Sequence, residues 1–132
     1  MKYSNVVVAG GGVLGSQIAF QAAYCGFNVT IWLRSEGSIG RTQPKIDHLK
    51  QTYIEAIEKM AEDKNAWCAG LADEDTFDKE ECLKKVENAY ANLKLELDMA
   101  KAVADADLVI ESMAENEKDK IAFYEKLSSL LP

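Results

Sequence analysis

The segment Asn5–Arg34 reads NVVVAGGGVLGSQIAFQAAYCGFNVTIWLR, and the fold of the chain depends on it. The β-branched run Val6–Val8 is followed by a glycine cluster and then by apolar residues at helical spacing. A second β-branched and aromatic run follows at Val29–Trp32. This order predicts a strand, a tight turn, a helix and a second strand.

The expected helix has small and apolar residues on one side. Leu14, Ile18, Ala22 and Cys25 recur at intervals of three and four, which predicts that they form the face packed against a sheet. Gly26 follows as a residue that can end the helix.

The turn between strand and helix carries the motif G-x-G-x-x-G at Gly10, Gly12 and Gly15. The first glycine allows a tight turn, the second lets the backbone approach a pyrophosphate, and the third lets the helix pack close to the strand. The start of the helix presents unpaired N–H groups and a positive dipole end to phosphates. We therefore predict a dinucleotide site at Gly10, Gly12, Val13, Leu14 and Gly15. The alternative is a purely structural turn in an unrelated α/β domain.

The end of the second strand bears on the choice of dinucleotide. An acid there accepts a hydrogen bond from the ribose 2′-OH of NAD, whereas an arginine accommodates the 2′-phosphate of NADP. Here Arg34 is followed by Ser35, with Arg41 a short distance along the chain. These residues favour NADP. Two alternatives stay open, because Arg34 could be a solvated residue and Glu36 could supply a contact of the NAD type.

Length and composition indicate one globular domain over residues 1–132, with 48% hydrophobic and 28% charged residues. The net charge of −7 argues against a nucleic-acid or anionic-membrane surface, because both partners are polyanions. No apolar stretch has the length of a membrane span, and the cytoplasm is the expected location.

The three cysteines have neither the number nor the spacing of a disulfide framework or zinc site, so we expect reduced and mostly buried thiols and no metal. They are Cys25, Cys68 and Cys82.

Two amphipathic helices are predicted at about residues 42–92, after a turn-like stretch at 35–41 that contains Gly37 and Gly40. A break rich in acidic residues separates them, and Asp78 with Glu81 can form a capping box at the start of the second. Each helix needs a partner for its apolar stripe, which predicts a helical hairpin. The stripes are Ile46, Leu49, Tyr53, Ile57 and Met60, then Leu83, Val86, Tyr90 and Leu93.

The rest of the chain predicts an edge strand at 93–97, a short helix at 98–104, a strand buried on both faces at 108–110 and a last helix. Asn116 is the expected N-cap of that helix. Together these elements indicate an α/β fold, a Rossmann-type parallel sheet with the hairpin inserted between strands 2 and 3 and incomplete at the C-terminus. The last helix is expected to face the sheet through Ile121, Tyr124, Leu127 and Leu131.

Two motifs resemble those of the L-3-hydroxyacyl-CoA dehydrogenase family and its diketoreductase-like relatives. The first is GGGVLGSQIA at 10–19, and the second is DLVIE at 107–111, followed by Glu115, Asn116 and Lys120. The resemblance implies an oxidoreductase that moves hydride between a nicotinamide and a 3-hydroxyacyl or 3-oxoacyl substrate, such as an acyl-CoA in the full protein. It also implies that Glu115 and Lys120 lie beside the nicotinamide and its ribose. Ordinary capping of a helix start is the alternative for these two residues.

The sequence departs from the family in two respects. Members that use NAD have an acid where this chain has Arg34, which puts the family's default coenzyme in doubt. The sequence also stops before the family's general acid/base residues, and its single histidine, His48, is expected to be a solvated helix residue. We therefore expect no catalytic residue in this chain and no activity from the chain alone.

The stop also leaves the apolar strand at 108–110 without a neighbour, so we expect a truncated domain that pairs with a second copy, as a homodimer, or is unstable. Two other functions remain possible: a dinucleotide-sensing module without chemistry, and a structural α/β scaffold that binds no nucleotide.

Overall fold

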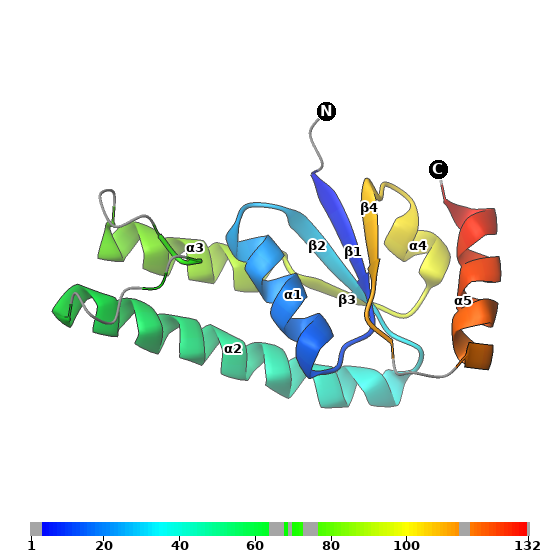
Figure 1. Ribbon diagram of the computed structural model, residues 1–132, viewed down its shortest axis with the longest axis horizontal. Coiled ribbons are helices and arrows are strands. Elements are labelled where there is room, and N and C mark those ends of the chain that lie inside the picture. Colours follow the sequence, from blue (N-terminus) through cyan, green and yellow to red (C-terminus); the bar gives the residue numbers. More distant parts are fainter. Residues whose placement is uncertain (1–3, 64–67, 69, 73–76, 114–116, 132) are drawn as a thin grey trace.

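The computed structural model describes residues 4–63, 68, 70–72, 77–113 and 117–131, and the described part forms a parallel sheet covered by helices (Figure 1). The elements follow the chain in this order: β1 Asn5–Ala9, α1 Val13–Tyr24, β2 Asn28–Trp32, α2 Glu36–Glu62, α3 Lys79–Asn92, β3 Lys94–Glu96, α4 Met99–Val103, β4 Leu108–Glu111 and α5 Glu117–Leu130.

The sheet has the order β3-β2-β1-β4, and all its neighbouring strands are parallel. Val8 in β1 lies opposite Ile31 in β2 and opposite Ile110 in β4. This arrangement confirms the predicted α/β fold with a Rossmann-type sheet. Because all strands run the same way, their carboxyl ends meet at one edge of the sheet, where such sheets bind ligands.

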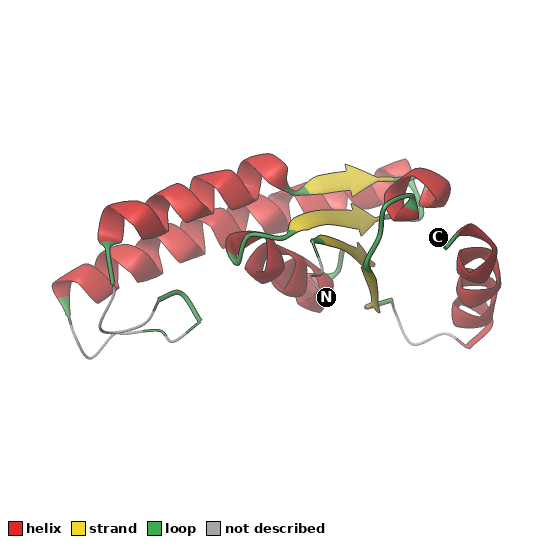
Figure 2. Cartoon of the chain, turned by 90° about the horizontal axis from the view of Figure 1, so that it is seen from above, coloured by secondary structure: helices red, strands yellow, loops and turns green. Residues whose placement is uncertain are grey.

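Alternate residues of β1 build two separate cores. Val6 and Val8 face α1 and the hairpin, and Val7 and Ala9 face α4 and α5. The four side chains are at most 4% exposed, so the central strand is buried on both faces. This alternation follows from the two-residue period of a strand, and it places helices on both sides of the sheet (Figure 2).

The helices α2 and α3 form the predicted hairpin, which packs on α1 and extends beyond the sheet (Figures 1 and 2). The buried residues Ile57 of α2 and Val86 of α3 belong to the core that α1 shares. The Asp78 carboxylate accepts hydrogen bonds from the N–H groups of Glu80 and Glu81, which confirms it as the N-cap of α3. Much of the connection lies outside the described residues, including the predicted contact of Trp67.

Two tyrosines join α1 to the hairpin. The Tyr24 hydroxyl donates to the Leu71 carbonyl at 2.6 Å, and the Tyr53 hydroxyl donates to Gln21 Oε1 at 2.5 Å. Burial raises the pKa of Tyr53 from its ordinary value of 10.0 to about 12, which extends the pH range in which the hydroxyl is a hydrogen-bond donor. Tyr53 also packs edge-on against the ring of Phe20.

The prediction of a turn at 35–41 is wrong, because α2 already begins at Glu36. Gly37 and Gly40 disfavour a helix by propensity, but tertiary contacts compensate for this cost. Ile39 packs against the core, and the Thr42 side chain is 2% exposed and hydrogen-bonded.

The predicted inner face of α1 is also wrong in part. Leu14 is 64% exposed and Cys25 is exposed, while the buried side of the helix carries Ser16, Phe20 and Tyr24. Gly15 shares this buried side, because the helix touches the strand end there.

The prediction for the last helix needs a similar correction. Ile121, Tyr124 and Leu131 are about half exposed. Leu127 is buried as predicted, and together with Phe123, which was not predicted, it packs on α4 and on the sheet. Asn116, the expected N-cap, lies outside the described residues.

Three further expectations can be compared with the structure. The strand β3 is at one edge of the sheet, as predicted. The strand β4 is not buried on both faces, because it forms the other edge and Leu108 is 44% exposed. The expectation of mostly buried cysteines is wrong, because only Cys82 is buried. No helix among the described residues is long and apolar enough to cross a membrane.

Candidate dinucleotide-binding site

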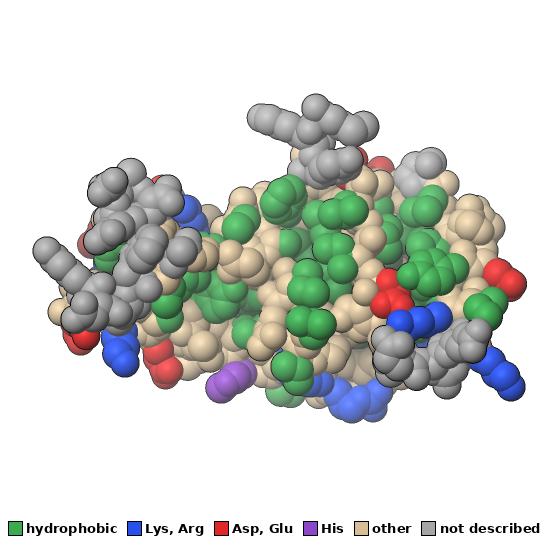
Figure 3. Space-filling view, viewed as in Figure 1, with side chains coloured by type: hydrophobic (Ala, Val, Ile, Leu, Met, Phe, Trp, Pro, Cys, Tyr) green, Lys and Arg blue, Asp and Glu red, His purple; other side chains and the backbone are tan. Residues whose placement is uncertain are grey.

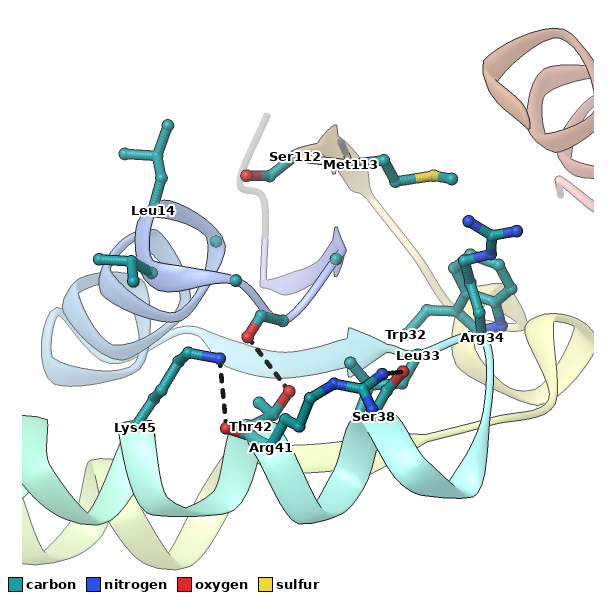
Figure 4. Close-up of a pocket in the computed structure, with 15 residues that line it drawn as sticks. Leu14, Trp32, Leu33, Arg34, Ser38, Arg41, Thr42, Lys45, Ser112 and Met113 are labelled. Carbon is teal, nitrogen blue, oxygen red and sulfur yellow. Dashed lines mark hydrogen bonds between the residues drawn. The ribbon is translucent and has the colours of Figure 1, made fainter. Parts of the chain in front are cut away.

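A cavity of about 480 Å³ opens at the carboxyl ends of β1, β2 and β4 (Figure 4). The glycine turn forms one wall, the end of β2 and the first turns of α2 form another, and the residues after β4 complete it. The lining residues are Gly10, Gly11, Gly12, Val13, Leu14, Gly15, Trp32, Leu33, Arg34, Ser38, Arg41, Thr42, Lys45, Ser112 and Met113.

Gly10 joins the ends of three strands at this cavity. Its φ of +121° is one that residues with a side chain rarely adopt, and a Cβ there would lie 2.4 Å from the Ser112 carbonyl oxygen. Its N–H donates to the Trp32 carbonyl at 3.1 Å. The first glycine of the motif therefore allows both the turn and the close approach of the residues after β4.

Gly15 and Gly12 differ in what surrounds them. A Cβ at Gly15 would lie 2.3 Å from the Gly10 carbonyl oxygen, so this glycine lets α1 pack against the end of β1. A Cβ at Gly12 would meet nothing within 4 Å. The second glycine of the motif thus faces open space at the start of α1, where unpaired N–H groups gather.

Gly11 also lines the cavity, and it makes a contact that was not predicted from the sequence. The Gly11 carbonyl accepts hydrogen bonds from the Thr42 hydroxyl at 3.1 Å and from the Ser16 hydroxyl at 3.2 Å. Both hydroxyl side chains are buried. No local sequence pattern predicts this contact, because Thr42 lies 31 residues further along the chain.

The wall formed by β2 and α2 is basic. Arg34, Arg41 and Lys45 line the cavity together with the Ser38 hydroxyl, and no carboxylate is among the lining residues that the structure describes. Arg41 Nη2 donates to Ser38 Oγ at 3.0 Å, and Lys45 Nζ donates to the Arg41 carbonyl at 3.2 Å (Figure 4). Lys and Arg side chains also gather on the surface over the first turns of α2 (Figure 3). This local positive charge contrasts with the net charge of −7.

Two predicted residues of this wall lie just outside the cavity. Ser35 is the N-cap residue of α2, and its hydroxyl is 3.1 Å from that of Ser38. Glu36, the alternative partner for a ribose, is exposed on the first turn of α2 and is not among the lining residues.

Of the two residues expected near a nicotinamide, the structure describes one. Lys120 Nζ lies 3.1 Å from Glu111 Oε1, which ties α5 to the end of β4. Glu111 Oε2 also accepts a hydrogen bond from the N–H of Met113, a lining residue. Glu115 lies outside the described residues.

His48 is exposed on α2, as predicted. It borders a second groove of about 290 Å³, which Val13, Pro44 and Leu49 also line. Among the described residues, no group of His, Cys, Asp and Glu side chains could hold a metal ion.

Residues 5–132 match the family described as 3-hydroxyacyl-CoA dehydrogenase, NAD binding domain. The chain belongs to this family. The match covers both the glycine turn and the β4 segment, so it confirms the resemblance inferred from those motifs.

Several known proteins are similar to this chain in sequence or structure. The mitochondrial hydroxyacyl-coenzyme A dehydrogenase of Rattus norvegicus is 29% identical over 123 residues, which cover 93% of this chain and 34% of the rat protein. A solved diketoreductase, described as acting on dicarbonyl compounds, is 33% identical with a TM-score of 0.75 and covers 100% of this chain and 39% of its own. FadB2 of M. tuberculosis, at 23% identity and a TM-score of 0.70, shares the fold over 100% of this chain and 38% of its own.

The chain thus spans about a third of the length of the relatives that it matches. It corresponds to their NAD-binding domain.

Proposed function

We propose that this chain binds a nicotinamide dinucleotide in the cavity at the glycine turn and acts as the coenzyme-binding part of an oxidoreductase. The observation that carries the proposal is the open space at Gly12, beside the N-terminus of α1. A pyrophosphate placed there would meet N–H donors and the positive end of the helix dipole without a Cβ in its way.

The proposed contacts divide the coenzyme between two ends of the cavity. Gly10, Gly12, Val13, Leu14 and Gly15 would hold the pyrophosphate through the backbone of the turn and the first turn of α1. At the adenosine end the proposed contacts are Arg34 and Ser35. The family resemblance supports Glu115 and Lys120 at the nicotinamide end.

We further propose that the coenzyme is NADP(H). The cavity wall beside the end of β2 carries Arg34, Arg41 and Lys45 and no described carboxylate. An NAD site of this fold normally has an acid at this strand end, and an acid would repel a 2′-phosphate. Guanidinium groups bind phosphate with paired hydrogen bonds, so the wall is better suited to the phosphorylated ribose.

Titration calorimetry with NADPH and with NADH tests this proposal. We expect the chain to bind NADPH more tightly than NADH. Arg34→Asp should weaken NADPH binding at least tenfold and should change the affinity for NADH little. Lys84→Asp, the same change in charge at an exposed position of α3, should leave both affinities unchanged. Tighter binding of NADH to the unmodified chain would contradict the NADP proposal while supporting the dinucleotide site.

The proposed reaction is transfer of hydride between the nicotinamide and carbon 3 of a 3-hydroxyacyl or 3-oxoacyl substrate, with an acyl-CoA as the substrate class. Its support is membership of the family, and the coenzyme supplies the hydride chemistry. We expect a polypeptide that carries this domain at the full length of its relatives to oxidise 3-hydroxyacyl-CoA, and the 132-residue chain to be inactive. Coenzyme binding without turnover by that polypeptide would instead favour a sensing module.

Pairing with a second copy is proposed at the β4 edge. The strand β4 is an edge strand of the described sheet and carries the 44% exposed Leu108. Edge strands of this kind favour the addition of another strand. Sedimentation equilibrium should show a dimer, and a monodisperse monomer would contradict the pairing. The cytoplasmic location stays a prediction, because the mammalian relative is a mitochondrial enzyme.

A further inference from the structure

The glycine turn is attached to the hairpin through the carbonyl group of Gly11. Thr42 of α2 reaches the Gly11 carbonyl with its hydroxyl at 3.1 Å, and Ser16 of α1 reaches the same oxygen at 3.2 Å. Thr42 is 2% exposed, and Ser16 is fully buried. Both lone pairs of this carbonyl are therefore used by buried donors, which is a well-satisfied arrangement for a buried acceptor.

The Thr42 side chain also fills the space next to Gly11. A Cβ at Gly11 would lie 2.2 Å from Thr42 Oγ1 and 2.9 Å from Thr42 Cγ2. The helix and the turn are thus in direct contact, and the turn cannot move toward α2. The side chain limits the position of Gly11 while its hydroxyl sets the direction of the carbonyl.

The direction of this carbonyl determines the direction of a neighbouring donor. A trans peptide is planar, so the C=O of Gly11 and the N–H of Gly12 point in opposite directions. Gly12 is the N-cap residue of α1 and faces open space. Fixing the Gly11 carbonyl on Thr42 and Ser16 consequently fixes the N–H of Gly12 before any ligand arrives.

We propose that Thr42 is a positioning residue that holds the Gly11–Gly12 peptide in the orientation required to bind the pyrophosphate. The inference rests on the proposed dinucleotide site. It assigns to the hairpin helix α2 a part in phosphate binding, exerted through the glycine turn. Preorganised donors bind more tightly because the cost of ordering them is already met.

The test compares Thr42→Val, which keeps the shape and removes the hydroxyl, with Thr42→Ser, which keeps the hydroxyl. Binding of ADP, which has a pyrophosphate, and of adenosine, which has none, is followed by NMR titration, and NADPH and NADH are titrated by calorimetry. Thr52→Val makes the same change at an exposed position of α2 and serves as the control.

We expect Thr42→Val to bind ADP and both dinucleotides about threefold to tenfold more weakly, the size of effect that loss of one hydrogen bond produces. Adenosine binding should not change. Thr42→Ser should bind like the unmodified chain, because its hydroxyl can still hold the carbonyl. A structural defect alone would lower the thermal midpoint and affect adenosine and ADP equally.

The outcomes separate this inference from the proposed function. If the unmodified chain binds neither ADP nor a dinucleotide, the proposed function fails and the inference fails with it. If the unmodified chain binds them and Thr42→Val binds equally well, only the positioning role is overturned. Should Thr42→Val not fold, Thr42→Ala removes the hydroxyl without adding bulk, and equal ADP affinity of the Ala and Ser variants would overturn the role.

Discussion

Glu111 and Lys120 form an ion pair of 3.1 Å between the end of β4 and the first turns of α5. The second carboxylate oxygen of Glu111 accepts a hydrogen bond from the Met113 N–H at 3.3 Å. One side chain therefore holds both a lysine expected at the nicotinamide end and a residue that lines the cavity. This geometry suits a role in which Glu111 positions Lys120 and Met113 without contacting the coenzyme itself.

Glu111→Gln should weaken binding of the dinucleotides several-fold and leave ADP binding unchanged. The amide keeps an acceptor for Met113 but removes the charge that holds Lys120. The side chains of the pair are only 16% and 25% exposed, so losing the charge should cost about 1 to 3 kcal/mol of stability. Calorimetry with NADPH, NADH and ADP measures the first effect and thermal melts the second.

Glu125→Gln at an exposed position of α5 is the matched control for this change. Equal dinucleotide affinity of Glu111→Gln and the unmodified chain would show that the ion pair has no part in coenzyme binding.

Gly15→Ala should destabilise the fold by about 1 to 3 kcal/mol, the range expected for overpacking a tight contact. The added Cβ would lie 2.3 Å from the Gly10 carbonyl oxygen, which is backbone and has little room to move. Urea unfolding followed by circular dichroism measures the change. A loss below about 0.5 kcal/mol would mean that α1 can shift away from β1 at little cost.

Gly12→Ala should behave differently, with a stability loss of about 1 kcal/mol or less and at least tenfold weaker binding of ADP. The new methyl group meets no protein atom within 4 Å, and φ of −70° suits alanine, although the N-cap position disfavours it. It would occupy the space proposed for the pyrophosphate. Titration with ADP decides the point, and undiminished affinity would place the phosphates elsewhere.

Asp107→Asn should make the chain less stable at pH 7 and should reduce the further loss of stability in acid. Asp107 Oδ2 accepts hydrogen bonds from the N–H groups of Ser4 and Asn5, and these bonds hold the pKa of the carboxyl below its ordinary value of 3.8. A lowered pKa gives stability that is present above about pH 4 and is lost as the pH falls through the folded-state pKa.

Thermal midpoints at pH 7 and at pH 2 to 3 test the Asp107 prediction. Asp107→Asn should melt below the unmodified chain at pH 7, and the difference should shrink in acid. Asp105→Asn is the control, because Asp105 holds Asn5 Nδ2 through its backbone carbonyl. A difference that stays constant with pH would show that the charge of Asp107 contributes nothing.

Features that depend on the local conformation of the backbone could be predicted from the sequence. Gly10 and Gly15 occupy places where a Cβ would collide with backbone, and such requirements appear directly as glycine in the sequence. The hairpin was predicted for a similar reason, because Ile57 and Val86 belong to long apolar stripes that fit only a helix.

Features that depend on distant contacts were missed. Of the residues predicted to face the sheet, Leu127 is buried but Ile121 and Tyr124 are about half exposed, whereas Phe123 is buried and was not predicted. Only the position of the sheet decides which side of the helix is covered. The bond between Thr42 and Gly11 likewise has no local signature. The helical turns at the start of α2 were missed for the same reason, because Ile39 and Thr42 make distant contacts that compensate for the low helix propensity of the glycines there.

The 27-residue helix α2 has a consequence for how this domain can change in evolution. Thr42 fixes the helix at the glycine turn and Ile57 fixes it in the hairpin core. Inserting or deleting one residue between them would rotate one contact relative to the other by about 100°, since a helix has about 3.6 residues per turn. We therefore expect homologous chains to vary in length elsewhere, while residues 42–57 are inherited as a segment of constant length.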